Sequence, residues 1–379
     1  MKKLYYIGLD VHARTIAVAV ADGRSVRSLG AIEHDVPKVL KLLRKIGPMG
    51  NLRIVYEAGP TGYGLCRALR SAGCNCEVIA PSLIPSMPGD RVKTDRRDAE
   101  KLAMLAQAGL LTTVYVPELE QEALRDLVRA REAAKEWQKK SGQQLDKFLL
   151  RHGRRPAVKM TKWTTKHMNW VRSQRFEQPA QQTSFEEYLA EYDHQCERVR
   201  RLDDHLVAGA EQLRPEQQAI VRALVALKGV RFLTAVTVVS EVGDMMRFGH
   251  PTQLMAYAGV VPREHSSGDT VRKGAITKAG NAHLRRIVGE SAWSYSRGLS
   301  GAGKDVRKRR EGLSAPIVAI AERADHRLRQ RYPRALSGRG KHKNKVITAV
   351  ARELLGFIWA VGVQAQLEHA RAPSKAEAA

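Results

Sequence analysis

Residues 4–21 read LYYIGLDVHARTIAVAVA, and this stretch decides the fold of the N-terminal part of the chain. Two runs of apolar and β-branched residues are separated by a short break at 12–14, which predicts two consecutive strands. The first run ends on a carboxylate, Asp10. A charge at the end of an apolar strand is costly unless it binds a partner. Asp10 is therefore the first candidate for a functional residue.

An acid follows an apolar run a second time in RIVYEAG, where the run ends on Glu57 before Gly59 and Pro60. Two further acids, Asp95 and Asp98, lie in KTDRRDAEKLAMLAQAG, a stretch that predicts a helix. Their i, i+3 spacing puts both carboxylates on one helical face. Acids at two strand ends and on one helical face can converge on one point.

Carboxylate oxygens are the ligands that Mg²⁺ prefers, and two such ions about 4 Å apart can clamp the attacking and leaving oxygens of a phosphodiester. Taken one at a time, these acids are more often solvated surface residues or helix caps. Asp95, after Thr94, could also serve as a first-turn acid that the helix dipole favours. The recurrence of an acid at two strand ends favours a metal-dependent nucleic-acid enzyme.

The elements predicted for residues 1–115 define a mixed α/β sheet with helices on its faces. Strands are expected at 4–10, 15–21, 29–34, 53–58 and 76–80, and helices at 36–46, 63–72 and 94–108. Acids on the first strand, a later strand and a late helix make this the ribonuclease H/RuvC-like arrangement. We therefore predict a RuvC-like domain over residues 1–115.

Beyond that domain the pattern becomes helical. Apolar residues recur at helical spacing at about 118–150 and 184–213, and a helix of roughly 30 residues is about 45 Å long. Two such helices joined by a loop predict an antiparallel coiled-coil arm over 116–215, often a device for oligomerisation. A helical hairpin packed on its own chain is the alternative that stays open.

The loop between those helices, 147–175, holds the sharpest run of positive charge. It contains nine Lys or Arg residues and no acid, and tryptophans interleave with them. Phosphates pair with such cations and unstacked bases stack on such rings. The loop is therefore predicted to contact nucleic acid, rather than to be only a solvated surface. The candidate residues are Arg151, Arg154, Arg155, Lys162 and Trp163.

The third part, 216–362, is predicted to be a mostly helical domain. Its segment LVALKGVRFLTAVTVVSEVGD (224–244) has the outline of a helix-hairpin-helix, in which a glycine turn offers backbone N–H groups to a phosphate. Arg231 replaces the second glycine usual in such motifs, and arginine can itself reach a phosphate. A plain helix–turn–helix packing stays open. A tail at 363–379 is expected to be disordered.

A stretch rich in turn residues and cations lies within this part: LMAYAGVVPREHSSGDTVRKGAITKAGNAHLRR (254–286). Its doubled serine, 266–267, could hold a nucleophile, provided that the hydroxyl is activated and cations neutralise the attacked phosphate. Most such stretches are only flexible loops. The predicted nucleic-acid contacts here are Arg263, Arg272, Lys273, Lys278 and Arg285.

Composition supports a nucleic-acid partner. The 379 residues include 64 Lys+Arg and 39 Asp+Glu, a net charge of +25, and such a bias concerns partners rather than fold. Residues 226–379 hold 27 basic and 12 acidic residues, so the C-terminal part is the most cationic. We expect neither a secretory leader nor a membrane span. The four cysteines match no zinc pattern, which favours a cytoplasmic protein with reduced thiols.

Four motifs together resemble a known family. GLDVH (8–12), YEAGPTGYG (56–64), KTDRRDA (93–99) and the block at 256–286 are similar to the DEDD insertion-sequence transposases that also carry a catalytic serine, insertion-sequence family one-ten. The resemblance covers about residues 4–360. The order of two distant motif blocks is far more specific than either block alone.

The resemblance implies more than composition does. It assigns Asp10, Glu57, Asp95 and Asp98 to a tetrad that binds Mg²⁺, and Ser267, the serine before glycine, to the nucleophile. It implies three partners: double-stranded DNA at the element ends and target, a structured guide or bridge RNA, and further copies of the chain in a dimer or tetramer. In such an oligomer the RuvC-like domain of one subunit meets the serine domain of another. Strand exchange passes through a covalent phosphoserine link.

Three classes of function stay open. The favoured one is the RNA-guided serine transposase, with Ser266 as the alternative nucleophile. A RuvC-type structure-selective endonuclease would use the tetrad alone, which leaves residues 216–360 without a role. A non-enzymatic nucleic-acid-binding protein would explain the charge and leave the tetrad unexplained.

Overall fold

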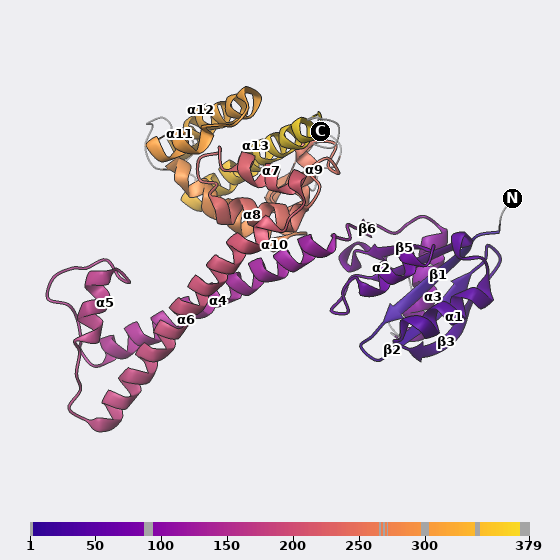
Figure 1. Ribbon diagram of the computed structural model, residues 1–379, viewed down its shortest axis with the longest axis horizontal. Helices are drawn as coiled ribbons and strands as arrows, with labels where there is room; N and C mark the ends of the chain where they lie inside the picture. The colour runs from indigo at the N-terminus through magenta and orange to yellow at the C-terminus, as the bar shows by residue number, and fades with distance from the viewer. Residues whose placement is uncertain are drawn as a thin grey trace, which may run out of the picture. The chain divides into compact units, whose positions relative to one another are not determined.

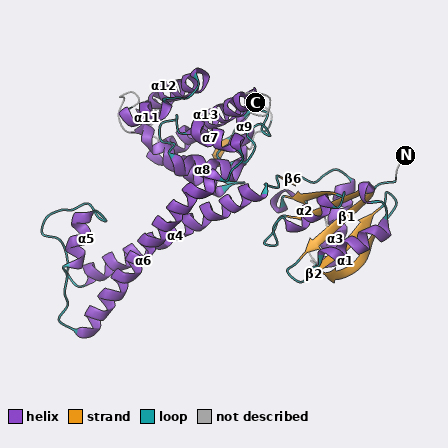
Figure 2. Cartoon of the chain, in the orientation of Figure 1, coloured by secondary structure: helices purple, strands orange, loops and turns teal. Residues whose placement is uncertain are grey.

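The computed structural model describes residues 3–86, 94–264, 267, 270, 272–296, 303–337 and 342–371. The chain divides into two compact units, Met1–Pro117 and Glu118–Ala379. Figure 2 shows that the first unit holds a large sheet, whereas the second is almost entirely helical. The first boundary lies close to the one predicted at 115. The arm and the C-terminal helices, which the sequence predicts as separate domains, belong to one unit.

Six strands form the sheet of the first unit, in the order β3-β2-β1-β4-β5-β6. The first strand, β1 (Tyr5–Val11), is antiparallel to β2 and parallel to β4. The other strands are β2 (Thr15–Ala21), β3 (Val26–Glu33), β4 (Leu52–Glu57), β5 (Asn75–Ile79) and β6 (Thr113–Val114). This is the mixed sheet that the sequence predicts, with β6 added as an antiparallel partner of β5.

Helices lie on both faces of this sheet (Figure 1). The helices are α1 (Val36–Ile46), α2 (Gly64–Ser71) and α3 (Asp95–Gln107), with short 3₁₀ turns η1 (Met49–Asn51) and η2 (Pro81–Leu83). Alternate residues of β2 divide between the layers, because side chains of a strand point to opposite faces in turn. Val18 and Val20 join the core formed with α1 and α2, whereas Ala17 and Ala19 pack with α3. Every element predicted for this region is present, and α1 has the predicted bounds.

Two long helices, α4 (Leu119–Arg151) and α6 (Pro179–Glu211), run side by side in the second unit (Figure 1). The short α5 (Thr165–Arg172) lies between them in the sequence. At the start of α4 and the end of α6, Leu124 and Leu206 belong to the large core of the C-terminal helices. Around the loop between the helices, Phe148 and Phe185 belong to a separate small core. The helix pair expected from the sequence is thus present, packed at one end on its own chain.

The remaining elements of the second unit surround one large core. They are α7 (Pro215–Leu224), α8 (Phe232–Val242), α9 (Pro251–Tyr257), β7 (Pro262–Glu264), β8 (Lys273–Ile276), α10 (Ala282–Ala292), η3 (Trp293–Ser296), α11 (Lys304–Arg310), α12 (Ala315–Ser337) and α13 (Lys343–Arg371). Three helices of the second unit, α6, α7 and α9, begin on a proline, whose missing N–H needs no partner in a first helical turn.

The helix α13 is the central element of this core. Among the described residues it is the one helix that is long and apolar enough to cross a membrane. Half of its most apolar stretch, however, is buried inside the structure. The helix contacts α7, α9, α10 and α12, and its Leu354 and Ile358 are fully buried. The prediction of a disordered tail from residue 363 is wrong as far as Arg371, because apolar residues such as Ala365 continue the buried face of the helix. Residues 372–379 lie outside the described part of the chain.

Candidate active site

Asp10 is positioned by the close approach of α3 to β1. Gly8 and Asp10 point to the same face of the sheet, because they are two residues apart on one strand. A Cβ added at Gly8 would lie 2.1 Å from the carbonyl oxygen of Ala99 and 2.6 Å from the backbone nitrogen of Ala103. Only glycine therefore allows the helix to lie directly on the strand that carries Asp10.

The start of α3 is fixed by its own cap. Thr94 has an extended backbone, and its hydroxyl oxygen accepts a hydrogen bond from the N–H of Arg97 at 3.3 Å. Asp95 and Asp98 fall in the first turn of the helix, as their spacing predicts. A first-turn position also suits a negative charge, because the helix dipole is positive there.

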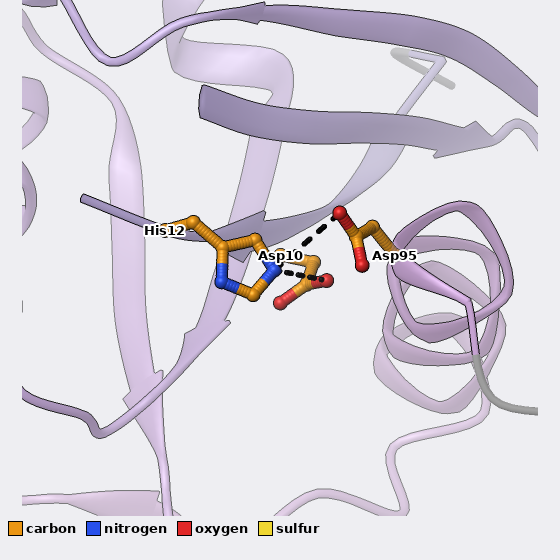
Figure 3. Close-up of side chains that lie close together, drawn as sticks. All are labelled: Asp10, His12 and Asp95. Carbon is orange, nitrogen blue, oxygen red and sulfur yellow. Dashed lines mark hydrogen bonds and ion pairs between the residues drawn. The ribbon is translucent and has the colours of Figure 1, made fainter. Parts of the chain in front are cut away.

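Three side chains meet at this point, and Figure 3 shows them. The ligand atoms of Asp10, His12 and Asp95 all lie within 4.8 Å of one another. His12 Nε2 is 3.2 Å from a carboxylate oxygen of Asp10 and 3.6 Å from one of Asp95. We call these three residues the acid cluster. Two oxygen donors and one ring nitrogen converge on a partly open site.

The electrostatics of the acid cluster suit a cation. Partial burial raises the pKa of Asp10, and the negative charges of Asp95 and Asp98 raise it further, whereas the nearby imidazole of His12 lowers it. The ionised carboxylates therefore repel one another. A cation would relieve that repulsion. Asp98 thus lies close enough to act on Asp10, although it is outside the acid cluster as defined.

Glu57 lies beside Asp10 in the sheet. Leu9 pairs with Tyr56 across the parallel strands β1 and β4, so Asp10 and Glu57 each follow by one residue and point to the same face. Glu57 is exposed at the end of β4. Asp10 and Asp95 therefore lie close enough together to bind one ion. Glu57 and Asp98 are their neighbours.

His12 belongs to the acid cluster, and the sequence reasoning did not single it out. A single histidine after a strand is a weak signal. The signal that could have found it is its position two residues after Asp10, which places both side chains on one side of an extended chain. Its backbone N–H donates to the carbonyl of Thr15 at 2.9 Å and closes the turn between β1 and β2.

Ser267 lies at the far end of the hairpin formed by β7 and β8, which we call the serine hairpin. Its N–H donates to the carbonyl oxygen of Thr270 at 3.2 Å, and the N–H of Thr270 donates back at 3.1 Å. Both residues are exposed. Ser266, the alternative nucleophile, lies outside the described residues.

The base of this hairpin is clasped by two glycines in the left-handed region. Gly259 has φ +66°, and an added Cβ would lie 1.9 Å from the carbonyl oxygen of Ala279. Gly280 has φ +72°, and an added Cβ would lie 2.2 Å from the carbonyl oxygen of Tyr257. The N–H of Lys278 donates to the carbonyl of Gly259 at 3.0 Å. The sequence AYAG…KAGN therefore encodes a rigid base for the strand pair that leads to Ser267.

A buried carboxylate ties this base to the long helix α4. Glu241 of α8 is 1% exposed, and Arg129 of α4 donates two hydrogen bonds to it, both at 2.9 Å. Asn281 Nδ2 also donates to Glu241 at 2.7 Å, while its Oδ1 accepts from the N–H of Leu284 and caps α10. Burial would raise the pKa of Glu241, but the hydrogen bonds from Arg129 and Asn281 hold it below its usual value.

The cations predicted around the serine fall into two kinds. Arg263, Arg272, Lys273 and Lys278 are exposed along the hairpin. Arg285 is half-buried, and its Nη1 donates to the carbonyls of Ala258 and Ala279 at 2.8 and 3.3 Å. Part of its donor capacity therefore stabilises the hairpin base.

The segment expected to form a helix-hairpin-helix consists of α7 and α8 joined by a turn. Gly229 in that turn has φ +84°, and an added Cβ would lie 2.4 Å from the carbonyl oxygen of Ser291. Arg309 of α11 donates to the carbonyl of Val225 at 2.7 Å. Arg231, the N-cap residue of α8, is highly exposed, 3.9 Å from Asp305. Phosphate binding at this turn stays a prediction.

The loop between α4 and α6 carries less unpaired charge than its sequence predicts. Lys162 donates to Asp146 at 2.6 Å, and Arg172 donates to Asp193 at 2.7 Å. Both acids lie on the long helices, outside the run itself. The prediction of an uncompensated run is therefore wrong for these two cations.

Other residues of this loop divide between packing and exposure. Trp163 lies against Tyr192, with ring centroids 4.6 Å apart. Arg154 donates to the carbonyl of Arg175 at 2.7 Å. Arg151 and Arg155 are exposed.

Two family models match the chain, each over one part. The model described as "Transposase", of the DEDD type, matches residues 7–153, which include all four acids. The model described as "Transposase IS116/IS110/IS902 family" matches residues 221–304, which include Ser267.

Relatives extend this likeness over the whole chain. The chain is 43% identical to a putative transposase, y4qE, of Sinorhizobium fredii over 95% of this chain and 89% of that protein. It is 32% identical to the transposase for insertion sequence element IS1533 of Leptospira borgpetersenii over 88% of this chain and 96% of that protein. It is 27% identical to a probable family 20 transposase of Pseudomonas aeruginosa over 71% of this chain and 79% of that protein.

Proposed function

Since this chain belongs to the IS116/IS110/IS902 family of insertion-sequence transposases, we propose that it cleaves and rejoins DNA by attack of Ser267 on a phosphodiester. The acid cluster, with Glu57 and Asp98, would hold a divalent cation, Mg²⁺ above all. The observation that carries the proposal is the approach of Asp10, at a strand end, to Asp95, at a helix start, within 4.8 Å.

The donor set fits the proposed ion. Carboxylate oxygens are hard ligands of the kind that Mg²⁺ and Mn²⁺ bind, and imidazole is accepted by Mn²⁺ and softer ions. The raised pKa of Asp10 also fits, because burial first, and then the charges of Asp95 and Asp98, disfavour its ionised form, which a bound cation would stabilise. When bound, a divalent cation would offset the negative charge that develops at the scissile phosphate.

The bonds formed and broken in the proposed step balance, and no energy-carrying cofactor is needed. The Ser267 oxygen forms a P–O bond while one ester P–O bond of the strand breaks. The departing deoxyribose oxygen takes the electron pair and gains a proton, and the serine proton passes to a base. A serine hydroxyl needs such activation because its own pKa lies far above neutral pH. The covalent phosphoserine keeps the energy of the phosphodiester, so rejoining needs no ATP.

We further propose that the protein acts on double-stranded DNA as a dimer or tetramer, guided by a structured RNA, as the sequence resemblance implies. Support comes from charge: the chain carries +25, and exposed cations line both the serine hairpin and the loop at 147–175. These cations suit phosphate contacts.

A recombination assay with two plasmids tests this function. One plasmid carries the element ends and the other the target, with Mg²⁺ and an RNA transcribed from the sequence flanking the reading frame. We expect joined product from the wild type, and loss of at least about 10²-fold for Asp10→Asn and for Ser267→Ala. Glu100→Gln, on the same helix as Asp95, and Thr270→Val, across from Ser267, are the matched controls.

The outcomes separate the classes of function. Product that forms without Mg²⁺, or that Ser267→Ala still gives at the wild-type rate, contradicts the proposal. If the product forms equally well after RNase treatment, no RNA guide is needed and that part of the proposal is wrong. Mg²⁺-dependent nicking that ignores the serine change would mark a RuvC-type endonuclease instead.

A further inference from the structure

A groove of about 800 Å³ runs between α12 and α13, away from every residue assigned above. Its walls carry four arginines of α12 together with a histidine and a glutamine: Arg323, His326, Arg327, Gln330, Arg331 and Arg334. The first three arginines follow one another at i, i+4 and i+8. Because a helix rises 1.5 Å per residue, the Cα atoms of successive arginines lie about 6 Å apart along the helix axis, on one face.

A half-buried carboxylate orders the middle of this row. Glu353 of α13, whose side chain is 14% exposed, accepts a hydrogen bond from Nε of Arg327 at 2.8 Å. It also forms an ion pair with Arg331, whose Nε lies 3.0 Å from its other carboxylate oxygen. Each guanidinium has five N–H donors, and these two contacts use only the Nε edge. One acid therefore positions two arginines, and each guanidinium has more donors than a contact through Nε uses.

The groove keeps an excess of positive charge. Its four arginines meet two carboxylates, those of Glu322 and Glu353. The side chains of Arg327 and Arg331 are 67% and 46% exposed. Within the described part of the chain, the buried side of α12 consists of residues such as Ile320 and Leu328, so packing of the helix does not require the arginine row. Like charges held in a row repel one another unless an anion lies between them.

We propose that this arginine groove binds the phosphate backbone of double-stranded DNA. The inference rests on the proposed transposase function, which requires the protein to bind DNA at places other than the site of chemistry. Arginine side chains are well suited to phosphate, because their planar fork can pair with two oxygens at once. The one phenyl ring of the groove, Phe357, belongs to its partly buried floor. A groove whose described walls hold no exposed Phe, Tyr or Trp suits a duplex backbone, whereas unpaired bases need rings to stack on.

The test is duplex binding at several salt concentrations with the full-length protein. Arg323→Gln with Arg334→Gln removes two charges and leaves both partners of Glu353 in place, so the fold is not put at risk by an unpaired buried acid. Arg200→Gln with Arg201→Gln, on an exposed part of α6, removes the same charge elsewhere. The probe is a fluorescent duplex of random sequence, followed by anisotropy.

The groove variant should bind the duplex several-fold more weakly than the α6 variant. The slope of log affinity against log salt should become shallower by up to about 0.9 for each phosphate that the variant no longer neutralises. Equal affinities and slopes for the two variants would overturn the inference. A weakening confined to a structured RNA probe, with duplex binding unchanged, would overturn it too, because the groove would then be an RNA site.

The same variants keep this inference separate from the proposed chemistry. If the groove variant binds duplex normally while Ser267→Ala abolishes recombination, the groove assignment fails and the serine mechanism stands. If the groove variant loses duplex binding while Ser267→Ala recombines normally, the groove stands and the serine mechanism fails.

Discussion

Asp10 is held in a position that benefits function at the expense of stability. Its pKa is raised by burial and by the charges of Asp95 and Asp98. The folded state therefore binds the Asp10 proton more tightly than the unfolded state does. As pH rises from the ordinary aspartate pKa through the raised one, this residue loses its proton and folding stability falls. At neutral pH the ionised carboxylate is a cost that a cation can offset.

Asp10→Asn should consequently stabilise the protein when metal is absent. We expect its melting temperature in EDTA to exceed that of the wild type by only about 1–2 °C, because solvent screens much of the repulsion at a partly exposed carboxylate. Addition of Mg²⁺ should raise the melting temperature of the wild type and leave that of the variant unchanged, because only a state that binds the ion is stabilised. Differential scanning calorimetry in EDTA and in Mg²⁺ measures both effects.

The control for this experiment is Glu100→Gln, an acid of α3 that pairs with Arg96 at 3.0 Å. It should keep the response to Mg²⁺. A wild type that shows no rise with Mg²⁺ or Mn²⁺ would argue against a metal site at the acid cluster.

For individual residues, the sequence indicates which acids are candidates but not how they are arranged in space. Asp10, Asp95 and Asp98 could be predicted because apolar runs and helical spacing are local signals. His12 gives only the weak signal of its spacing from Asp10, because its place 3.6 Å from Asp95 depends on the packing of a helix far along the chain. Gly8 is similar, since only the position of α3 shows why a side chain is excluded there.

The serine hairpin is the element on which the proposed chemistry depends, and its glycine clasp can be tested. Gly259→Ala would force a methyl group toward the carbonyl of Ala279 at 1.9 Å, at a φ of +66° that alanine disfavours. A cost of about 1–2 kcal/mol from the backbone alone, together with the clash, should displace the hairpin. We expect recombination to fall by at least about tenfold while the response of melting temperature to Mg²⁺ stays normal.

Gly274→Ala on β8 of the same hairpin is the matched control. The nearest atom to an added Cβ there is Cβ of Arg263 at an ordinary 3.7 Å, so activity should be retained. If both alanine variants recombine at the wild-type rate, the clasp does not position the serine.

The loop at 147–175 gives a second test at the scale of an element. Arg155 and Lys159 are exposed, whereas Arg172 is held by Asp193 at 2.7 Å. Arg155→Gln with Lys159→Gln should weaken binding of the proposed guide RNA. The salt dependence of that binding should become shallower by up to about one unit of slope for each phosphate no longer neutralised. Arg172→Gln should have less effect on the slope, because its charge is already paired. Filter binding over a salt series measures these slopes. Equal slopes for the wild type and both variants would show that the loop does not contact RNA.

Elements were largely predictable, because they follow from local periodicity. The helix at Val36–Ile46 has the predicted bounds, with Asp35 capping it through the N–H of Lys38 at 2.9 Å. The pairing of the basic loop was not predictable, since Asp146 and Asp193 come from helices whose packing brings them to the loop. The clasp at Gly259 also depends on a contact between segments that are distant in sequence.

At the scale of the whole molecule, the chain divides near the predicted boundary but into two units rather than three. Periodicity gives the lengths of α4 and α6, yet it cannot show that Leu124 and Leu206 share a core with the C-terminal helices. The end of α13 is another case. A run with several polar residues after 363 resembles a tail, but the helix continues because its buried stripe reaches Ala365.

The central claim is that a serine of this chain becomes covalently joined to DNA. The most direct measurement is to incubate the protein with element-end DNA, the RNA and Mg²⁺, denature it in SDS, and map the modified peptide by mass spectrometry. We predict an SDS-resistant adduct whose phosphate and nucleotide are on Ser267, absent from Ser267→Ala and Asp10→Asn and present in Thr270→Val. Attachment to Ser266 would keep the chemistry and correct the residue. Cleavage that leaves free 5′-phosphate and 3′-hydroxyl ends, with no adduct on either serine, would contradict the account.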